Sequence, residues 1–305
     1  SPGTTAVLEV DEAVLPWAVE TLTPRMAVLL NLSRDQLDRL HEVRRVAGLW
    51  RRALVQVPTV VTNAADPLLV WAAASAGNVH WVDTGLFWTD DASACPACGR
   101  RIRFGPRPWS CACGLRQPVA LTVLHDDGTL SGDGWQVLLD LPLPGRTNRS
   151  NAALAVAAAM EMGVAPTTAV TAFAGVREVG GRFFHREIDG HSVRLILAKN
   201  PAGWAHALEI IDAPAVVVAL NAQIQDGFDP SWIWDVPFEV LGNRQVVASG
   251  ERFADLRVRL AYAGIDAVGI PDLRDAIRSL PSGRVDLVAN YSAFMSAQRM
   301  LAGDG

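Results

Sequence analysis

The chain has 305 residues, 50% of them hydrophobic and 19% charged, so it has enough apolar material for a sizeable core and a length that suggests two domains. Its net charge of −5 gives no basic footprint, which argues against a nucleic-acid partner. We find no signal-peptide pattern and no apolar run long enough to cross a bilayer, so we expect a cytoplasmic protein without a transmembrane segment.

The first half of the chain alternates short apolar runs with helical stretches. This alternation predicts a mostly parallel, doubly wound α/β sheet. We expect strands at 6–10, 26–30, 59–62, 79–82, 119–123 and 135–141, and helices at 34–54, 68–76 and 150–162.

The second half repeats the α/β pattern after a candidate hinge at 176–182, where paired glycines free the backbone. We expect strands at 193–198, 215–220, 245–248 and 286–289, with helices at 204–211, 251–263 and 273–280. The hinge divides the chain into two expected domains, 1–182 and 183–305.

Four cysteines interrupt the first domain in the stretch CPACGRRIRFGPRPWSCAC. Cys95-x-x-Cys98 and Cys111-x-Cys113 are each followed by glycine, and two such turns can close a tetrahedral thiolate site. The second pair is one residue shorter than the usual spacing, which we expect to strain the geometry. A structural zinc ribbon at about 92–118 is the preferred interpretation; four reduced thiols in a loop are the alternative, and a catalytic thiol is less favoured still.

Several motifs in a fixed order resemble the Mur ligase superfamily, and within it the MurT-type subunits of lipid II isoglutaminyl synthase. The resemblance covers almost the whole chain. The motifs are AVLEVDEA (6–13), NLSRDQLDRLHE (31–42), the cysteine cluster, TNRSNAALAVAAA (147–159), GGR (180–182), AKNPAGW (198–204) and DGFDPSWIWDVPFE (226–239). This resemblance implies a Mur ligase-like middle domain at 1–182, carrying the inserted zinc ribbon, and a Rossmann-like C-terminal domain at 183–305.

The chain departs from the family pattern in its phosphate loop, because no G-x-x-G-K-[ST] occurs in the sequence. We therefore expect the middle domain to be N-terminally incomplete and ATP turnover to need more than this polypeptide. In the D-H-L-D position of peptide-forming ligases the chain has Gln36, which the MurT-type branch shares.

The resemblance implies ATP and Mg²⁺ as cofactors and assigns five residues to them. Each has a plainer alternative: a solvated acidic loop for Glu12, a helix cap for Asn148, a surface amide for Asn151, an interdomain salt bridge for Arg182 and a turn for Asn200. In this assignment Glu12 contacts magnesium and the other four contact the nucleotide.

The stretch QDGFDPSWIWDVPFE places three aspartates among tryptophans. By resemblance, Asp229 is the carboxylate that completes a Cys-His pair in a GatD-like glutamine amidotransferase partner, with Asp235 as second choice. The alternative for Asp229 is an Asx-type cap, and a residue can do both. We interpret Asp226 as a turn residue, and Trp232 and Trp234 as interface or packing anchors.

The resemblance thus implies an ATP-dependent carboxylate-amine ligase subunit, which amidates the D-glutamate α-carboxylate of lipid II with ammonia from the partner. The alternatives are a peptide-forming Mur or folylpolyglutamate-type ligase and a non-catalytic activating scaffold. Gln36 and the cysteine insertion argue against the first, and the missing phosphate loop favours the second.

Overall fold

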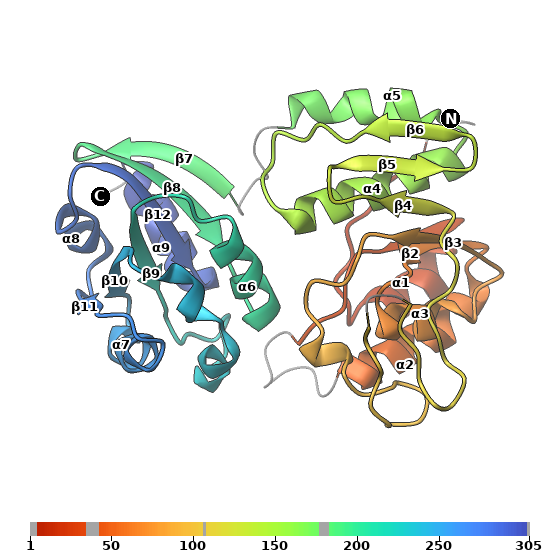
Figure 1. The fold of residues 1–305 in the computed structure, drawn as a ribbon, viewed down its shortest axis with the longest axis horizontal. Helices are drawn as coiled ribbons and strands as arrows, with labels where there is room; N and C mark the ends of the chain where they lie inside the picture. The colour runs from red at the N-terminus through yellow and green to blue at the C-terminus, as the bar shows by residue number, and fades with distance from the viewer. Residues whose placement is uncertain (1–4, 35–42, 106–107, 177–182, 304–305) are drawn as a thin grey trace. The chain divides into compact units, whose positions relative to one another are not determined.

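The computed structural model describes residues 5–34, 43–105, 108–176 and 183–303. The chain divides into two compact units (Figure 1). The first is built mainly from Leu40–Asp140 and Asn148–Ala174, with the N-terminal segment up to Ser33; the second is built chiefly from Gly175–Gly305. Among the described residues, no helix combines the length and the apolar character needed to cross a membrane.

In the described part of the first unit, six strands form one sheet in the order β1-β2-β3-β4-β5-β6. β1 to β4 are parallel, and β5 and β6 continue the sheet as an antiparallel return. The strands are β1 (Met26–Leu29), β2 (Thr59–Asn63), β3 (Asn78–Asp83), β4 (Thr122–Leu124), β5 (Thr129–Gly132) and β6 (Trp135–Leu138).

Helices pack on this sheet through apolar side chains. Trp50 and Leu54 meet Val60 of β2 and Leu68 in one buried cluster. The helices are α1 (Leu15–Leu22), α2 (Val43–Ala53), α3 (Pro67–Ala73), α4 (Arg146–Glu161) and α5 (Pro166–Thr171), with the short 3₁₀ turns η1 (Leu54–Gln56), η2 (Asp90–Ala92) and η3 (Ala172–Gly175). α3 begins where it does because Asp66 caps its first amides and Pro67 occupies its first turn.

The strand expected at 6–10 is wrong. These residues have no regular structure, and Val7 and Leu8 are exposed. An apolar run forms a strand only where a neighbouring backbone completes its hydrogen bonds, and among the described residues β1 pairs only with β2. The segment is held differently, because the indole of Trp50 donates a hydrogen bond to the carbonyl of Glu12 (2.7 Å).

The described residues of the second unit also form a six-stranded sheet, in the order β11-β10-β9-β12-β8-β7, parallel except for β7. The strands are β7 (Phe183–Ile188), β8 (His191–Leu197), β9 (Ala215–Ala219), β10 (Gln245–Ser249), β11 (Val268–Gly269) and β12 (Gly283–Ala289). The helices are α6 (Pro201–Glu209), α7 (Phe253–Tyr262), α8 (Leu273–Arg278) and α9 (Tyr291–Leu301), with the 3₁₀ turns η4 (Ser231–Asp235) and η5 (Phe238–Leu241).

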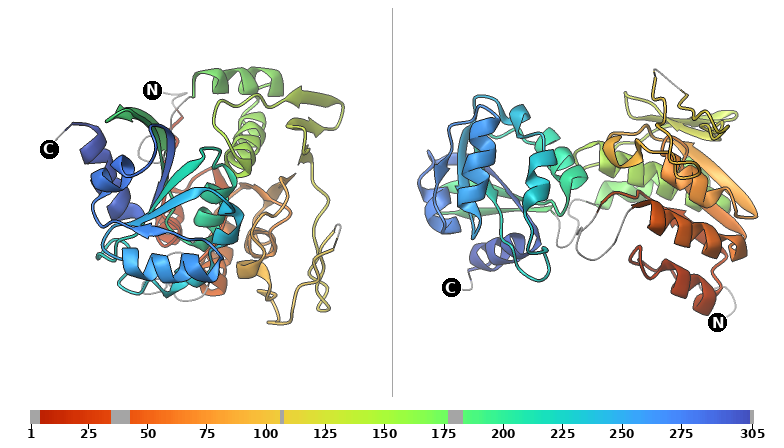
Figure 2. Two further views of the ribbon diagram at one scale, coloured as in Figure 1. Left: turned by 60° about the vertical axis from the view of Figure 1, so that its left-hand side comes forward. Right: turned by 90° about the horizontal axis from the view of Figure 1, so that it is seen from below.

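Both faces of this second sheet are covered. Val216 and Val218 of β9 pack into one core with α6, α7, η4 and η5, whereas Val217 packs into a second core with α8 and α9. Alternate residues of a strand point to opposite faces, so a strand covered on both sides reads as a continuous apolar run, as AVVVA does. Figures 1 and 2 show the helices on either side of this sheet.

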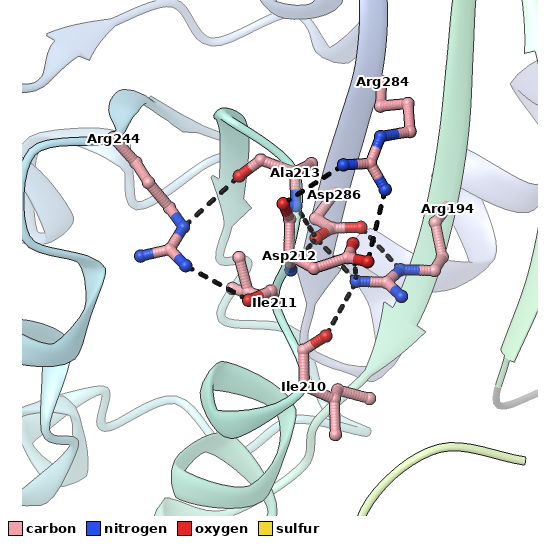
Figure 3. A network of polar contacts seen from close by, with 8 residues as sticks. All are labelled: Arg194, Ile210, Ile211, Asp212, Ala213, Arg244, Arg284 and Asp286. Atoms are coloured by element: carbon pink, nitrogen blue, oxygen red, sulfur yellow. Dashed lines mark hydrogen bonds and ion pairs between the residues drawn. The ribbon is translucent and has the colours of Figure 1, made fainter.

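A buried ion pair ties two parallel strands of the second unit together (Figure 3). Asp286 of β12 accepts two hydrogen bonds from the guanidinium of Arg194 of β8, at 2.6 and 2.7 Å. The same carboxylate accepts the backbone N–H groups of Asp212 and Ala213 (3.1 Å each), which fixes the turn before β9. The charge of Asp286 is therefore fully paired inside the sheet.

Candidate functional site

The four cysteines come together in the first unit. All four sulfur atoms lie within 4.8 Å of one another. Cys95 and Cys113 are 3.7 Å apart at their sulfurs, and Cys98 and Cys111 are 3.5 Å apart. A tetrahedral zinc site with Zn–S bonds of about 2.3 Å has sulfurs about 3.8 Å apart. The cluster therefore has the geometry to hold a metal ion. Despite the short C-x-C spacing, the sulfurs of Cys111 and Cys113 lie close enough to the first pair to bind the same ion.

Backbone amides face the sulfurs, as the glycine-containing turns predict. Burial raises the pKa of the Cys95 thiol to about 12, although the N–H groups of Cys98 and Ala97 oppose this. The N–H of Cys113 lowers the pKa of the Cys111 thiol to about 7. Ligation requires thiolates, and amide donors of this kind stabilise them.

The ribbon that carries the cysteines has an inner and an outer face. Ile102, Trp109 and Cys111 are buried with Val70 of α3 in a small apolar cluster, and the Trp109 indole donates to the carbonyl of Ala64 (3.3 Å). These contacts fix the insertion to its own unit. They give the cysteine cluster a structural setting, because the inner face packs as a core.

The segment DPSWIWDVPFE in the second unit is anchored by alternate contacts with the core. Ile233, Val236 and Phe238 are buried among residues of α6, α7 and the sheet. Arg259 of α7 donates to the carbonyl of Val236 (2.6 Å) and to Glu239 (2.9 Å). These contacts support the segment from the core side and leave Ser231, Trp234, Asp235 and Glu239 exposed.

Asp229 is exposed and held in place by one neighbour. Its Oδ1 accepts the backbone N–H of Ser231 (2.8 Å), and its Oδ2 accepts the Ser231 hydroxyl (3.0 Å). These bonds, the backbone one first, lower the pKa of Asp229 below its ordinary value of 3.8. The Asx-type cap expected from Asp-Pro-Ser is therefore present, and the carboxylate is ionised and accessible at neutral pH.

The other two aspartates of the stretch have different settings. Asp235 is exposed and pairs with Arg34 at 3.0 Å. Asp226 is buried and accepts from Gln223 N–H (3.2 Å) and from both the N–H (3.0 Å) and the hydroxyl of Ser292. The interpretation of Asp226 as a simple turn residue is incomplete, because its carboxylate also caps the first turn of α9.

The two tryptophans also differ. Trp232 is partly buried beside Trp204, with ring centroids 6.3 Å apart, and so is a packing residue. Trp234 is half exposed and stands edge-on to Tyr262 at 5.2 Å. Of these two tryptophans, Trp234 is the one that offers an aromatic surface to another molecule.

At the carboxyl end of the first sheet lies a polar cluster that the sequence reasoning did not single out. Asn63 ends β2 and donates to the Gly85 carbonyl (2.8 Å); Asp83 ends β3 and accepts the Gly85 N–H (2.9 Å). Thr84 contacts Ser150 of α4 (2.7 Å). Ligands of α/β proteins bind at this end of the strands. The sequence does carry a signal for this cluster, because the polar residues Asn63 and Asp83 directly follow the apolar residues of β2 and β3.

The predicted nucleotide residues of the first unit lie on α4. This helix begins at Arg146, earlier than expected, so Asn148 and Asn151 both sit in its first turns and not before it. Because Ser150 contacts Thr84, those turns lie at the carboxyl end of β3. Glu12 precedes α1 and does not follow a strand, so the strand-end argument for its magnesium role is lost.

In the second unit, Asn200 follows β8 and caps α6, its side chain accepting the Gly203 N–H at 2.8 Å. It therefore lies at the carboxyl end of the second sheet and caps a helix, where a turn was the alternative to its nucleotide role. Arg182 lies outside the described residues.

Comparison with known proteins identifies the relatives of this chain. Residues 197–294 match the family model described as MurT ligase C-terminal. Over 97% of its length the chain is 28% identical to the glutamine-hydrolysing lipid II isoglutaminyl synthase subunit MurT of Streptococcus pneumoniae, covering 74% of that protein. Over 86% of its length it is 26% identical to the Staphylococcus aureus (strain COL) subunit of the same name, covering 65% of it. The chain is MurT-like.

Solved structures show the same fold. A pseudomurein peptide ligase type C from Methanothermus fervidus superposes with a TM-score of 0.74 at 16% identity, covering 98% of this chain and 72% of that one. MurF from Acinetobacter baumannii gives 0.64 at 16% identity, covering 95% and 61%. The predicted Mur ligase-like α/β fold, the MurT resemblance and the expectation of a ligase-type enzyme subunit are confirmed.

Proposed function

We propose that this MurT-like chain is the synthetase-type subunit of a two-subunit ligase that amidates the D-glutamate α-carboxylate of lipid II, with ammonia released from glutamine by a GatD-like partner. The names of its relatives, which are subunits of a glutamine-hydrolysing lipid II isoglutaminyl synthase, support the substrate and the ammonia source. The observation that carries the proposal is the exposed, ionised Asp229 on a rigid segment inside the MurT-matching region.

Asp229 can supply the carboxylate that a glutaminase with only a Cys-His pair needs from a partner subunit. In such an enzyme the cysteine thiolate attacks the side-chain amide of glutamine, the histidine protonates the departing ammonia, and water then releases glutamate. A carboxylate on the second ring nitrogen fixes the tautomer and stabilises the imidazolium. Each oxygen of Asp229 accepts one hydrogen bond from Ser231 and has a further lone pair for an incoming ring N–H.

The surroundings of Asp229 also fit a protein partner. Trp234, with its ring edge-on to that of Tyr262, offers a large aromatic surface near one end of the segment, and Phe228 next to Asp229 is two-thirds exposed. Aromatic residues of this kind carry much of the energy of protein interfaces. We assign Trp234 to the interface and Trp232 to the core.

On the acceptor side of the reaction, we propose that Asn148 and Asn151 of the first unit contact the nucleotide and that Glu12 contacts the magnesium ion. The nucleotide roles of Asn200, in the second unit, and of Arg182 are proposed from the resemblance alone. The sequence contains no G-x-x-G-K-[ST] loop for the phosphates, so these residues by themselves do not make up the family's phosphate site. Zinc at the four cysteines would be structural, because four thiolates leave no open position for a substrate.

Glutamine hydrolysis by the GatD-like partner, with and without this chain, tests the proposal. With Asp229→Asn we expect kcat to fall by about 10³- to 10⁴-fold and KM to change little, because the amide cannot balance the imidazolium. Asp235→Asn is the matched control and is expected to retain activity. If the Asp229→Asn complex hydrolyses glutamine at the wild-type rate, or if only the Asp235→Asn complex loses activity, Asp229 is not part of the glutaminase site.

The acceptor specificity separates this function from a peptide-forming ligase. The complex is expected to form product from ammonia or glutamine and none from free amino acids, in accord with Gln36 in the place of the peptide-ligase histidine. Mass spectrometry of the stem peptide reads this out as a mass loss of about one unit on amidation. A product that has gained an amino-acid residue would support the peptide-forming alternative.

A further inference from the structure

The inserted ribbon is a basic part of this acidic chain. Between Ser93 and Pro118 the sequence has five arginines and no aspartate, glutamate or lysine. Since the whole chain carries −5 and this stretch carries +5, the remaining residues carry −10. A zinc ion held by four thiolates would add −2 to the ribbon and leave it positive.

The arginines are gathered on one face of the ribbon. Arg101 and Arg103 flank the buried Ile102, so both point away from the core. Ser110 pairs with Arg103 on one side and with Arg116 on the other, both antiparallel. Residues directly opposite each other in a sheet share a face, so Arg101, Arg103 and Arg116 form a single outer row. We call these three residues the arginine face.

In the part of the chain that the structure describes, no carboxylate neutralises the arginine face. Arg100, Arg101, Arg103 and Arg116 are all exposed. Within the described part of the chain, none of these four guanidinium groups has a carboxylate at ion-pair distance. Neighbouring strands are about 4.8 Å apart, so Arg103 and Arg116 repel each other across about 10 Å unless an anion lies over them.

Exposed apolar side chains accompany this charge. Phe104 follows Arg103 and is exposed, and Val119, where the ribbon rejoins the sheet, is 89% exposed. Arginines with aromatic and aliphatic neighbours are typical of segments that lie at the interface of an anionic bilayer. The left view of Figure 2 shows the ribbon, in yellow, as a narrow arm of its unit.

We propose that the arginine face of the ribbon docks this chain onto anionic phospholipid headgroups of a membrane surface. The occupant is a bilayer because its surface offers partners for both features of this face: anionic headgroups for the guanidinium groups, and an apolar layer beneath them for the exposed side chains of Phe104 and Val119. The proposal goes beyond the amidation reaction and does not depend on it.

Vesicle flotation with the 305-residue chain tests this docking. The vesicles contain phosphatidylcholine alone or a 7:3 mixture with phosphatidylglycerol, without lipid II or nucleotide, so that the result is independent of the ligase assay. We expect at least about tenfold stronger partition onto the anionic vesicles at low salt, falling as salt is raised. Equal partition onto both vesicle types would overturn the proposal.

Two matched double variants assign the binding to the ribbon. Arg101→Glu with Arg103→Glu is expected to weaken binding to anionic vesicles by about tenfold or more, at about 1 kcal/mol for each arginine near the surface. Arg25→Glu with Arg299→Glu changes the net charge equally at two exposed sites outside the ribbon and is expected to change binding less than about twofold. Equal losses in both would reduce the effect to net charge and refute the arginine face.

Two further measurements keep the outcome interpretable. Arg101→Gln with Arg103→Gln removes the charges without adding repulsion and is expected to give an intermediate loss, with zinc content unchanged in both ribbon variants. A short duplex DNA is added as competitor at the same phosphate concentration as the vesicles. If the DNA displaces the vesicles completely, the ribbon is a nucleic-acid surface and the membrane proposal is wrong.

Discussion

Asp226 and Ser292, 66 residues apart in the chain, meet in the second unit, where the carboxylate of Asp226 accepts both the backbone N–H and the hydroxyl of Ser292. Beside them, the side chain of Asn290 donates to the Asn221 carbonyl (2.7 Å) and accepts the Asn221 N–H (3.0 Å). The loop that leads to Asp229 is thus fastened to the start of α9 by buried polar contacts.

We predict that substitution of Asp226 affects mainly the stability of the fold, and that substitution of Asp229 affects mainly activity. Asp226→Ala leaves the two buried donors of Ser292 and the part-buried N–H of Gln223 without an acceptor, and is expected to lower the free energy of unfolding by about 2–4 kcal/mol. Asp229→Ala, at an exposed site, is expected to change it by less than about 1 kcal/mol. Urea unfolding followed by circular dichroism measures both, and similar losses would show that Asp229 is also a structural residue.

The buried pair of Arg194 and Asp286 gives a second prediction. Asp286→Ala removes the buried one of two carboxylates that pair with Arg194, leaving the exposed Asp212 (3.0 Å), and it removes the acceptor of two backbone N–H groups (Figure 3). This is expected to cost about 3–5 kcal/mol. The control is Arg284→Ala, which breaks an exposed pair with Asp212 and is expected to cost about 0–1 kcal/mol. A loss below about 1 kcal/mol for Asp286→Ala would contradict this account of the sheet.

The buried cap of α3 predicts a pH dependence of stability. Burial raises the pKa of Asp66 from 3.8 to about 7, against the two N–H groups it accepts. The folded state therefore holds a proton that the unfolded state loses above about pH 4, so the stabilisation is present below that pH and is lost as the pH rises to about 7.

Asp66→Asn isolates this contribution. The amide oxygen can still cap Leu68 and Leu69 but does not ionise. The stability of the variant relative to wild type is expected to increase by about 2–3 kcal/mol between pH 5 and pH 8. Urea unfolding of both proteins at the two pH values tests this, and a constant difference would mean that Asp66 is ionised in the fold throughout.

Metal binding at the cysteine cluster gives a fourth prediction. The purified chain is expected to contain about one zinc ion, and Cys98→Ser is expected to lose it or to bind it much more weakly. Removing the metal with a chelator is expected to speed tryptic cleavage at the arginines of the ribbon. Ser110→Ala, in the same ribbon but outside the cluster, is the control and is expected to keep its metal. Equal zinc contents for Cys98→Ser and wild type would exclude the cluster as the site.

Most parallel strands could be predicted from the sequence, because a strand covered on both faces is a continuous β-branched run, as in TVVTN and AVVVA. β7 was not predicted, because polar residues interrupt the apolar pattern in FFHREI, at the edge of the sheet. β11 is only two residues long. The segment 6–10 shows the converse error, since its composition suits a strand but hydrogen-bond partners decide whether one forms.

The sequence by itself determined what chemistry is available: four cysteines in two paired turns, a carboxylate in DPSW, and an ordered set of motifs that points to MurT. Only the tertiary structure decided which of these groups are buried and hydrogen-bonded and which are exposed. It buried Asp226 against Ser292 and left Asp229 in solvent three residues later, and it turned three arginines of one ribbon to the same side. The reason is physical: residue type and spacing set local propensity, but burial and pairing depend on what distant segments place alongside.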